Sequence, residues 1–150
     1  MQNNCLSCDI VSGKVDSLRV YENKYFHAHQ DYGIPIPGFV VISSKRHLRS
    51  MGDFNSEEQQ NFGVVLYKVR LAMIEALGIH TVYTAQKERD IDHFHFWILP
   101  RHEWIIKKFG NSTASISNSL DYAKEHLKTP ENFKLVEESA EKLYKHLNGN

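Results

Sequence analysis

The sequence predicts an α+β domain built on a mostly antiparallel sheet, with one long helix and a C-terminal helical extension. Short runs rich in β-branched and aromatic residues recur through the first hundred positions, one amphipathic stretch spans residues 56–77, and helical patterns return after residue 104. Because strands and helices are grouped rather than alternating, this order favours α+β over a parallel α/β sheet. The 150 residues are expected to form one domain, 1–150, with a core at about 5–104 and the extension at about 105–150.

Runs typical of strands are separated by turn residues. They lie at 19–22, 25–29, 39–43, 81–84 and 93–99. The segment 31–38 holds two of the four prolines and two glycines, so we expect a turn or loop there. The run that follows is apolar up to its last residue, Ser43, which favours a central strand.

The clearest helix is predicted from Ser56 to Leu77. Ser56 and Gln59 fit a capping box, and Gly78 suits the position after the helix. An apolar stripe at helical spacing supports it: Phe62, Val65, Leu66, Val69, Met73, Ala76 and Leu77. Thr129 followed by Pro130 predicts the start of another helix. The segment 111–119, rich in serine and asparagine, is expected to be flexible.

The run His93–Leu99 carries the most informative pattern. In a strand, alternate side chains share a face, so His93, His95 and Trp97 lie together. The other face then presents the apolar residues Phe94, Phe96 and Ile98. Two imidazoles about 7 Å apart suit metal binding or nucleophilic chemistry, although a chain with 9 histidines also produces such a pair by chance.

Composition excludes several classes of function. The 18 basic and 18 acidic residues balance, which argues against a non-specific nucleic-acid binder. No apolar run approaches the ~20 residues of a membrane span. The first residues lack the charged and apolar regions of a signal peptide. These observations favour a soluble, cytoplasmic protein.

The two cysteines, Cys5 and Cys8, form a C-x-x-C pair. In a reducing compartment such a pair is more often catalytic or metal-binding than a structural disulfide. A redox pair of the thioredoxin type follows a strand, and no strand is predicted before Cys5. The pair is therefore interpreted as half of a zinc site, with histidines as candidates for the other ligands.

Four motifs in order resemble the histidine triad (HIT) family, over roughly residues 5–104. Residues 5–13 resemble its C-x-x-C-x-I-x-x-G, and Val20-Tyr21-Glu22 with Phe26 resembles its first hairpin. Residues 37–47, ending in Lys45-Arg46-His47, resemble P-G-H-x-L-V-I-P-K-R-H. Residues 93–101 resemble H-x-H-x-H-x-x-P-R. The resemblance implies the HIT fold and, commonly, a homodimer.

The resemblance also implies roles for individual residues. His95 matches the family's nucleophile, which attacks the α-phosphorus of a nucleotide and forms a covalent nucleotidyl-histidine; its other ring nitrogen must be held by an acceptor. Asp31 matches an acidic residue that binds the ribose hydroxyls, although it could also simply start a turn. Phe26, like Phe39 and Ile42, is a candidate for the base pocket or, more simply, for the core. Arg101 is a candidate phosphate contact or a solvated end.

A structural Zn²⁺ is the cofactor that the resemblance implies. Family members with the N-terminal C-x-x-C add two histidines, which here are His47 and His93. The expected ligand set is therefore Cys5, Cys8, His47 and His93, a closed Cys₂His₂ site. The simpler alternative is a free dithiol.

The chain departs from the family pattern at two places. Trp97 replaces the third histidine, which contacts the phosphate, and an indole offers one donor and no proton shuttle. Related transferases carry glutamine there and still form the intermediate. Before the triad, Asp90 would repel a phosphate, whereas Lys87 or Arg89 could supply donors.

Three functions follow from these residues. The first is a nucleotide hydrolase or transferase acting through His95 on a nucleoside phosphoramidate or dinucleoside polyphosphate. The alternative is a zinc-stabilised nucleotide-binding protein with little or no catalysis. A metallohydrolase using zinc at His93 and His95 is disfavoured, because the Cys₂His₂ set leaves no open coordination position.

Overall fold

A five-stranded antiparallel sheet forms the centre of the protein in the computed structural model, which describes residues 5–88 and 93–149. The strands are β1 (Leu18–Glu22), β2 (Phe26–Gln30), β3 (Val40–Ser44), β4 (Val82–Gln86) and β5 (His95–Pro100). Their order is β1-β2-β3-β5-β4, and each neighbouring pair is antiparallel. Every residue of β2 and β3 is buried, as expected for strands inside the sheet.

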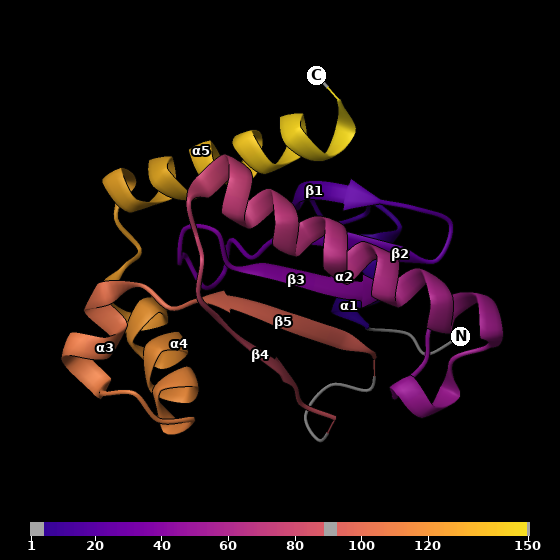
Figure 1. Ribbon diagram of the computed structural model, residues 1–150, viewed down its shortest axis with the longest axis horizontal. Coiled ribbons are helices and arrows are strands. Elements are labelled where there is room, and N and C mark those ends of the chain that lie inside the picture. The colour runs from indigo at the N-terminus through magenta and orange to yellow at the C-terminus, as the bar shows by residue number, and fades with distance from the viewer. Residues whose placement is uncertain (1–4, 89–92, 150) are drawn as a thin grey trace.

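One face of the sheet is covered by α2 (Ser56–Leu77), which lies in front of the sheet in Figure 1. The long C-terminal helix α5 (Pro130–Asn148) lies beside α2 and β1. Buried apolar side chains of both helices pack in one cluster with Phe26 and Ile42 of the sheet and with Phe94, which precedes β5. Each large side chain buried in this way contributes about 1.5–3 kcal/mol to folding.

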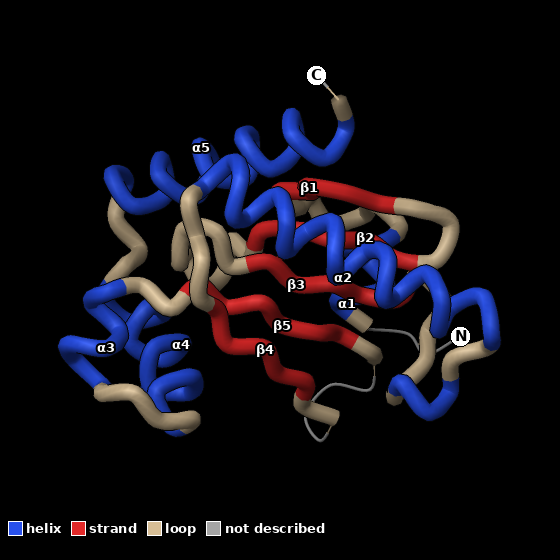
Figure 2. The backbone as a smooth tube through the Cα atoms, viewed as in Figure 1, coloured by secondary structure: helices blue, strands red, loops and turns tan. Residues whose placement is uncertain are grey.

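The opposite face, called here the open face, carries smaller elements. The short helix α1 (Leu6–Val11) lies behind the sheet and contacts β3 (Figure 2). At one end of the sheet, α3 (Glu103–Phe109) packs on α4 (Ala114–His126). Leu120 and Ala123 of α4 form a second apolar cluster with Phe39 and Leu99. A short 3₁₀ turn, Met51–Asp53, precedes α2.

The α+β class, the antiparallel sheet and the long helix agree with the sequence prediction. All five predicted strands are present, with ends that differ by one or two residues. The differences of two residues are at the end of β4, which extends to Gln86, and at the start of β5, which begins at His95 rather than His93. The faces alternate as predicted, since Phe94, Phe96 and Ile98 pack against the core on the α2 side while Trp97 joins the cluster of the open face.

Two local predictions were wrong. The N-cap of α2 is Asn55, whose side chain and that of Glu58 make the capping box predicted for Ser56 and Gln59. The segment 111–119 is not flexible throughout, because its second half forms the start of α4. There, the hydroxyls of the buried Ser115 and Ser119 bond to backbone carbonyls, while apolar residues of the same helix face the sheet. No helix in the described part of the chain is long and apolar enough to cross a membrane.

Candidate functional site

The strand register collects polar side chains on the open face. His27 of β2 pairs with Ser43 of β3, which pairs with His95 of β5. Residues paired across antiparallel strands point to the same side, so these three form one row. The next row contains His29, Val41 and Trp97. No role was predicted for His27 or His29, although their i, i+2 spacing on a strand places both on one face.

His95 is held in one tautomer by the backbone. Its Nδ1 lies 2.9 Å from the carbonyl oxygen of His93, so Nδ1–H donates and Nε2 keeps its lone pair. This is the acceptor that the sequence analysis required. The side chain is 5% exposed, and its ring centroid lies 5.5 Å from that of Trp97. The arrangement orients the imidazole so that Nε2 can face a ligand at the open face.

Cys5, Cys8, His47 and His93 come together as predicted. Their ligand atoms all lie within 4.8 Å of one another. Nδ1 of His93 is 3.4 Å from Sγ of Cys5 and 3.3 Å from Sγ of Cys8, and Nδ1 of His47 is 3.2 Å from Sγ of Cys8. A tetrahedral zinc site has sulfur–nitrogen distances of about 3.6 Å, so only a slight expansion would admit the ion. His95 does not belong to this cluster, which argues against the metallohydrolase alternative.

The protonation chemistry of the cluster also fits a metal. Burial and the neighbouring Cys5 raise the pKa of the Cys8 thiol to about 11, so a bound dication would be needed to hold it as a thiolate at neutral pH. Burial lowers the pKa of His93, which favours the neutral, ligating form. Nε2 of His93 donates to the carbonyl of Ser44 at 2.8 Å, leaving Nδ1 for the cluster.

Local structure brings the ligands into place. Cys5 is the N-cap of α1 and its sulfur accepts from the backbone N–H of Cys8, so both thiols lie at the start of one helix. His47 follows Arg46, whose guanidinium makes two bonds to the buried Glu58 carboxylate, at 2.9 and 2.7 Å. This bidentate pair ties the segment before His47 to the first turn of α2. It gives Arg46 a structural role.

Asp31 begins the loop between β2 and β3. Its Oδ1 accepts the backbone N–H of Ile34 at 2.9 Å, so the turn-starting role weighed in the sequence analysis is present. Burial raises the pKa of this carboxyl, while the N–H groups of Ile34 and Gly33 lower it. The bond from Ile34 uses Oδ1, and Oδ2 is the second acceptor of this carboxylate.

Two candidate substrate residues lie away from His95. Phe26 is 0% exposed and packs against Phe54, Phe62 and Phe94 on the α2 side of the sheet. It is therefore a core residue, and its assignment to the base pocket is corrected. Arg101 follows the last residue of β5, about 20 Å along the strand direction from His95, so the structure does not bring it to that histidine. Arg89 and Asp90 lie outside the described residues.

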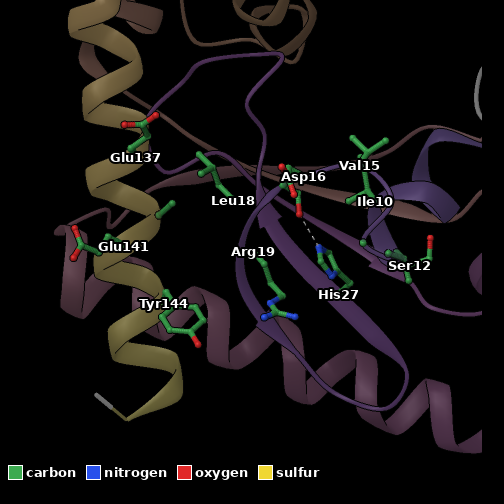
Figure 3. Close-up of a pocket in the computed structure, with 14 residues that line it drawn as sticks. Ile10, Ser12, Val15, Asp16, Leu18, Arg19, His27, Glu137, Glu141 and Tyr144 are labelled. Carbon is green, nitrogen blue, oxygen red and sulfur yellow. Dashed lines mark hydrogen bonds between the residues drawn. The ribbon is translucent and has the colours of Figure 1, made fainter.

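A cavity of about 630 Å³ opens beside β1 (Figure 3). Its walls are the end of α1, the segment 12–19 and one side of α5, and His27 points into it. Ser17 Oγ lies 3.3 Å from Nε2 of His27. Burial lowers the pKa of His27 to about 4 and that of His29 to about 3, so both are neutral near pH 7. Sequence reasoning did not foresee this cavity, because its walls come from segments more than 100 residues apart.

Taken together, the sheet, the oriented histidine and the Cys₂His₂ cluster define a protein of the HIT fold. The Zn-bound histidine triad family protein of Mycobacterium smegmatis superposes with a TM-score of 0.60 and 22% identity, covering 83% of this chain and 95% of that one. A HIT family hydrolase of Legionella pneumophila gives a TM-score of 0.55 and 24% identity, covering 67% and 95%.

Curated relatives point the same way. "Protein hit" of Bacillus subtilis is 25% identical over 104 residues, which are 66% of this chain and 72% of the relative. A HIT-like protein of Mycoplasma genitalium is 26% identical over 143 residues, 91% and 94% of the two chains. A galactose-1-phosphate uridylyltransferase of Thermotoga maritima is 26% identical over 104 residues, 65% of this chain but 33% of that enzyme. No family model matches the chain. The chain therefore has the HIT fold, and its ordered motifs and these relatives make it similar to HIT-like proteins.

Proposed function

We propose that this protein is a nucleotide hydrolase or transferase that forms a covalent nucleotidyl-His95 intermediate. The observation that carries the proposal is the bond from Nδ1 of His95 to the carbonyl of His93, which leaves Nε2 as the nucleophile. The fold is shared with a protein named as a HIT family hydrolase, and part of the chain is similar to a named uridylyltransferase. Nucleoside phosphoramidates and dinucleoside polyphosphates are the proposed substrates.

The reaction takes place in two steps. In the first, Nε2 of His95 forms a bond to the α-phosphorus while the bond from phosphorus to the amine or polyphosphate leaving group breaks. In the second, water attacks the same phosphorus, the bond from phosphorus to Nε2 of His95 breaks with its electron pair returning to Nε2, and a nucleoside monophosphate leaves. The attacking water releases one proton to solvent, which balances the proton that the leaving group takes up in the first step. A transferase would replace water with another nucleophile. The His93 carbonyl stabilises the imidazole when it carries the nucleotidyl group.

The open face has room for the rest of a nucleotide. His27 lies two strands from His95 in the same row, about 10 Å away, and it marks the cavity beside β1. A nucleoside attached to the α-phosphate spans a distance of this order. We therefore assign the cavity to the base and Oδ2 of Asp31 to the ribose hydroxyls.

Zinc is proposed as a structural cofactor bound by Cys5, Cys8, His47 and His93, the residues that already converge. When bound, it would tie α1 to the segment just before β5 and thereby stabilise the backbone that orients His95. It takes no part in the reaction steps.

Intact-mass spectrometry tests the mechanism directly. The protein is incubated with adenosine phosphoramidate, quenched at short times, and examined for the mass of one added adenylyl group. The wild type and a His126→Ala control, changed at a half-exposed histidine of α4, should form the adduct, and His95→Ala should not. An adduct on His95→Ala, or none on the wild type while substrate is being turned over, would contradict a nucleotidyl-His95 intermediate.

A binding protein with little or no catalysis is the second candidate, and Trp97 favours it. Its indole packs edge-on against Phe39 with ring centroids 6.4 Å apart, and it offers no proton acceptor beside His95. This alternative predicts nucleotide binding in calorimetry without an adduct.

We further propose a cytoplasmic homodimer that binds small nucleotides and neither nucleic acid nor membranes. Val64 and Tyr67 of α2 support a contact between copies, since 50% and 67% of their surfaces are exposed. Light scattering of the wild type and of Tyr67→Ser measures whether this helix face is used.

A further inference from the structure

The C-terminal helix α5 holds the loop that carries Asp31. The ring of Tyr32, the next residue, stacks on Phe133 of α5 with centroids 4.7 Å apart and planes 24° apart. Its hydroxyl donates to the Glu137 carboxylate at 3.3 Å. Two successive turns of α5 therefore contact the residue beside Asp31.

Asn132 makes the most specific of these contacts. Its side-chain amide donates to the carbonyls of Pro35 and Leu127, the second at 2.9 Å. Pro35 belongs to the Asp31 loop, and Leu127 follows the end of α4. One side chain thus joins the loop, the end of α4 and the start of α5.

The rest of the loop is held from within the sheet. The buried amide of Gln30 donates to the carbonyls of Asp31 and Ile36, both at 3.0 Å, and accepts the N–H of Gly38 at 2.7 Å. These three bonds fasten both ends of the loop, but none reaches residues 32–35. The outer half of the loop supplies the N–H of Ile34 that orients the Asp31 carboxylate. The side chain of Ile34 packs on the second apolar cluster, and the polar contacts from outside the loop come from α5.

We propose that Asn132 is a positioning residue: through Pro35 it keeps the Asp31 turn in the conformation that binds the ribose diol. The C-terminal extension would then set the preference of the site for nucleotides with an intact cis-diol. This inference rests on the proposed function, in which Asp31 binds the ribose hydroxyls.

Asn132→Asp separates positioning from helix stability. Asn132 is the third residue of α5, and its backbone N–H is capped by Thr129 at 3.2 Å, a bond that the substitution keeps. Aspartate has nearly the same shape and is favourable in a first helical turn, but a carboxylate cannot donate to the carbonyl of Pro35. We expect α5 to stay folded while the Asp31 turn loosens.

The experiment compares AMP with 2′,3′-dideoxy-AMP in calorimetric binding to the full protein. The wild type should bind AMP about 10- to 100-fold more tightly, as expected for hydrogen bonds to a carboxylate. Asn132→Asp should lower this ratio roughly 3- to 10-fold by weakening AMP alone. Circular dichroism should be unchanged, and the melting temperature should fall by only a few degrees, the cost of the two lost hydrogen bonds. Phe133→Leu should act in the same direction, and Ser139→Ala, on the same helix but bonded only within it, should not.

The outcomes separate the positioning role of Asn132 from the ribose contact of Asp31. If the wild type prefers AMP and Asn132→Asp keeps the full preference, the positioning role is wrong while the ribose contact stands. If the wild type binds both nucleotides equally, Asp31 does not bind the ribose hydroxyls, and the inference fails together with that part of the proposed function. If Asn132→Asp weakens both nucleotides equally, its effect is general and the inference is also overturned.

Discussion

The carbonyl oxygen of His93 accepts the Nδ1–H of His95 at 2.9 Å, while the His93 side chain belongs to the Cys₂His₂ cluster. A single residue therefore serves both parts of the site, its backbone orienting one imidazole and its ring joining the thiols. Nε2 of His93 is in turn fixed by the carbonyl of Ser44. A metal held by this cluster would therefore be coupled to the orientation of His95 through one peptide segment.

Replacing His95 should stop the reaction without unfolding the protein. His95→Ala removes the only nucleophile of the proposed mechanism, so turnover of a nucleoside phosphoramidate should fall by about three orders of magnitude or more. The sheet should persist, because the core lies on the other side. Steady-state rates and circular dichroism check both parts. Turnover within tenfold of the wild type would rule out His95 as the nucleophile.

Removing one of the two thiols should abolish zinc binding and thereby lower the stability of the fold. Cys8→Ser should reduce bound zinc from about one ion per chain to a trace, measured by mass spectrometry of the metal. The melting temperature should fall by roughly 6–12 °C, the shift for about 3 kcal/mol in a chain of this size. Treatment with a chelator should reproduce the fall in the wild type and leave Cys8→Ser unchanged. Zinc retained by Cys8→Ser would exclude this ligand set.

Sequence reasoning succeeded where structure is encoded locally. Strand alternation placed His95 and Trp97 on the open face, and helical spacing gave α2 its observed ends. The family resemblance brought together four ligands that lie as far apart in sequence as Cys5 and His93.

It failed where a contact joins distant segments. The hydrogen bond from Asn132 to Pro35 joins residues 97 positions apart, and no periodicity or motif in the sequence predicts it. A local feature was also missed: the buried Ser115 and Ser119 look flexible in the sequence, because composition does not reveal that carbonyls of nearby residues will accept hydrogen bonds from their hydroxyls. Phe26 had the right chemistry for a base pocket but lies on the other face of the sheet.

Restoring a histidine at position 97 should accelerate the chemistry. Trp97 lies beside His95 with ring centroids 5.5 Å apart, and a histidine there could transfer a proton to the leaving group. Trp97→His should raise the rate of adduct formation roughly tenfold or more in rapid-quench mass spectrometry. Trp97→Phe, which keeps a flat ring but adds no acid or base, should stay within about twofold. Equal rates for the two variants would argue that proton transfer at this position is unimportant.

Phe26 should affect stability and not ligand binding. Phe26→Ala removes a fully buried ring and should lower the free energy of unfolding by about 3–5 kcal/mol in urea titrations. Phe26→Leu fills most of the space, so it should cost less while leaving the affinity for AMP unchanged. If folded Phe26→Leu bound AMP more weakly than the wild type, Phe26 would be part of the binding site after all.

The Arg46–Glu58 pair should make stability depend on pH. Hydrogen bonds from Arg46, together with the N–H of Asn55, hold the pKa of Glu58 below its ordinary value. A depressed pKa in the folded state means that the pair stabilises the fold above the unfolded pKa of about 4.3. This contribution is lost as the pH falls through the lower, folded value.

Glu58→Gln measures this contribution in urea titrations at several pH values, with chelator present so that metal release does not contribute. The variant should be less stable than the wild type by about 1–3 kcal/mol at pH 7, and the difference should shrink below about pH 4. Glu141→Gln, at an exposed pair with Lys145, should match the wild type at every pH.

Because Glu58 anchors the segment before His47, Glu58→Gln should also bind zinc more weakly when no chelator is present. A stability difference that is the same at pH 3 and pH 7 would show that the charge of Glu58 does not stabilise the fold.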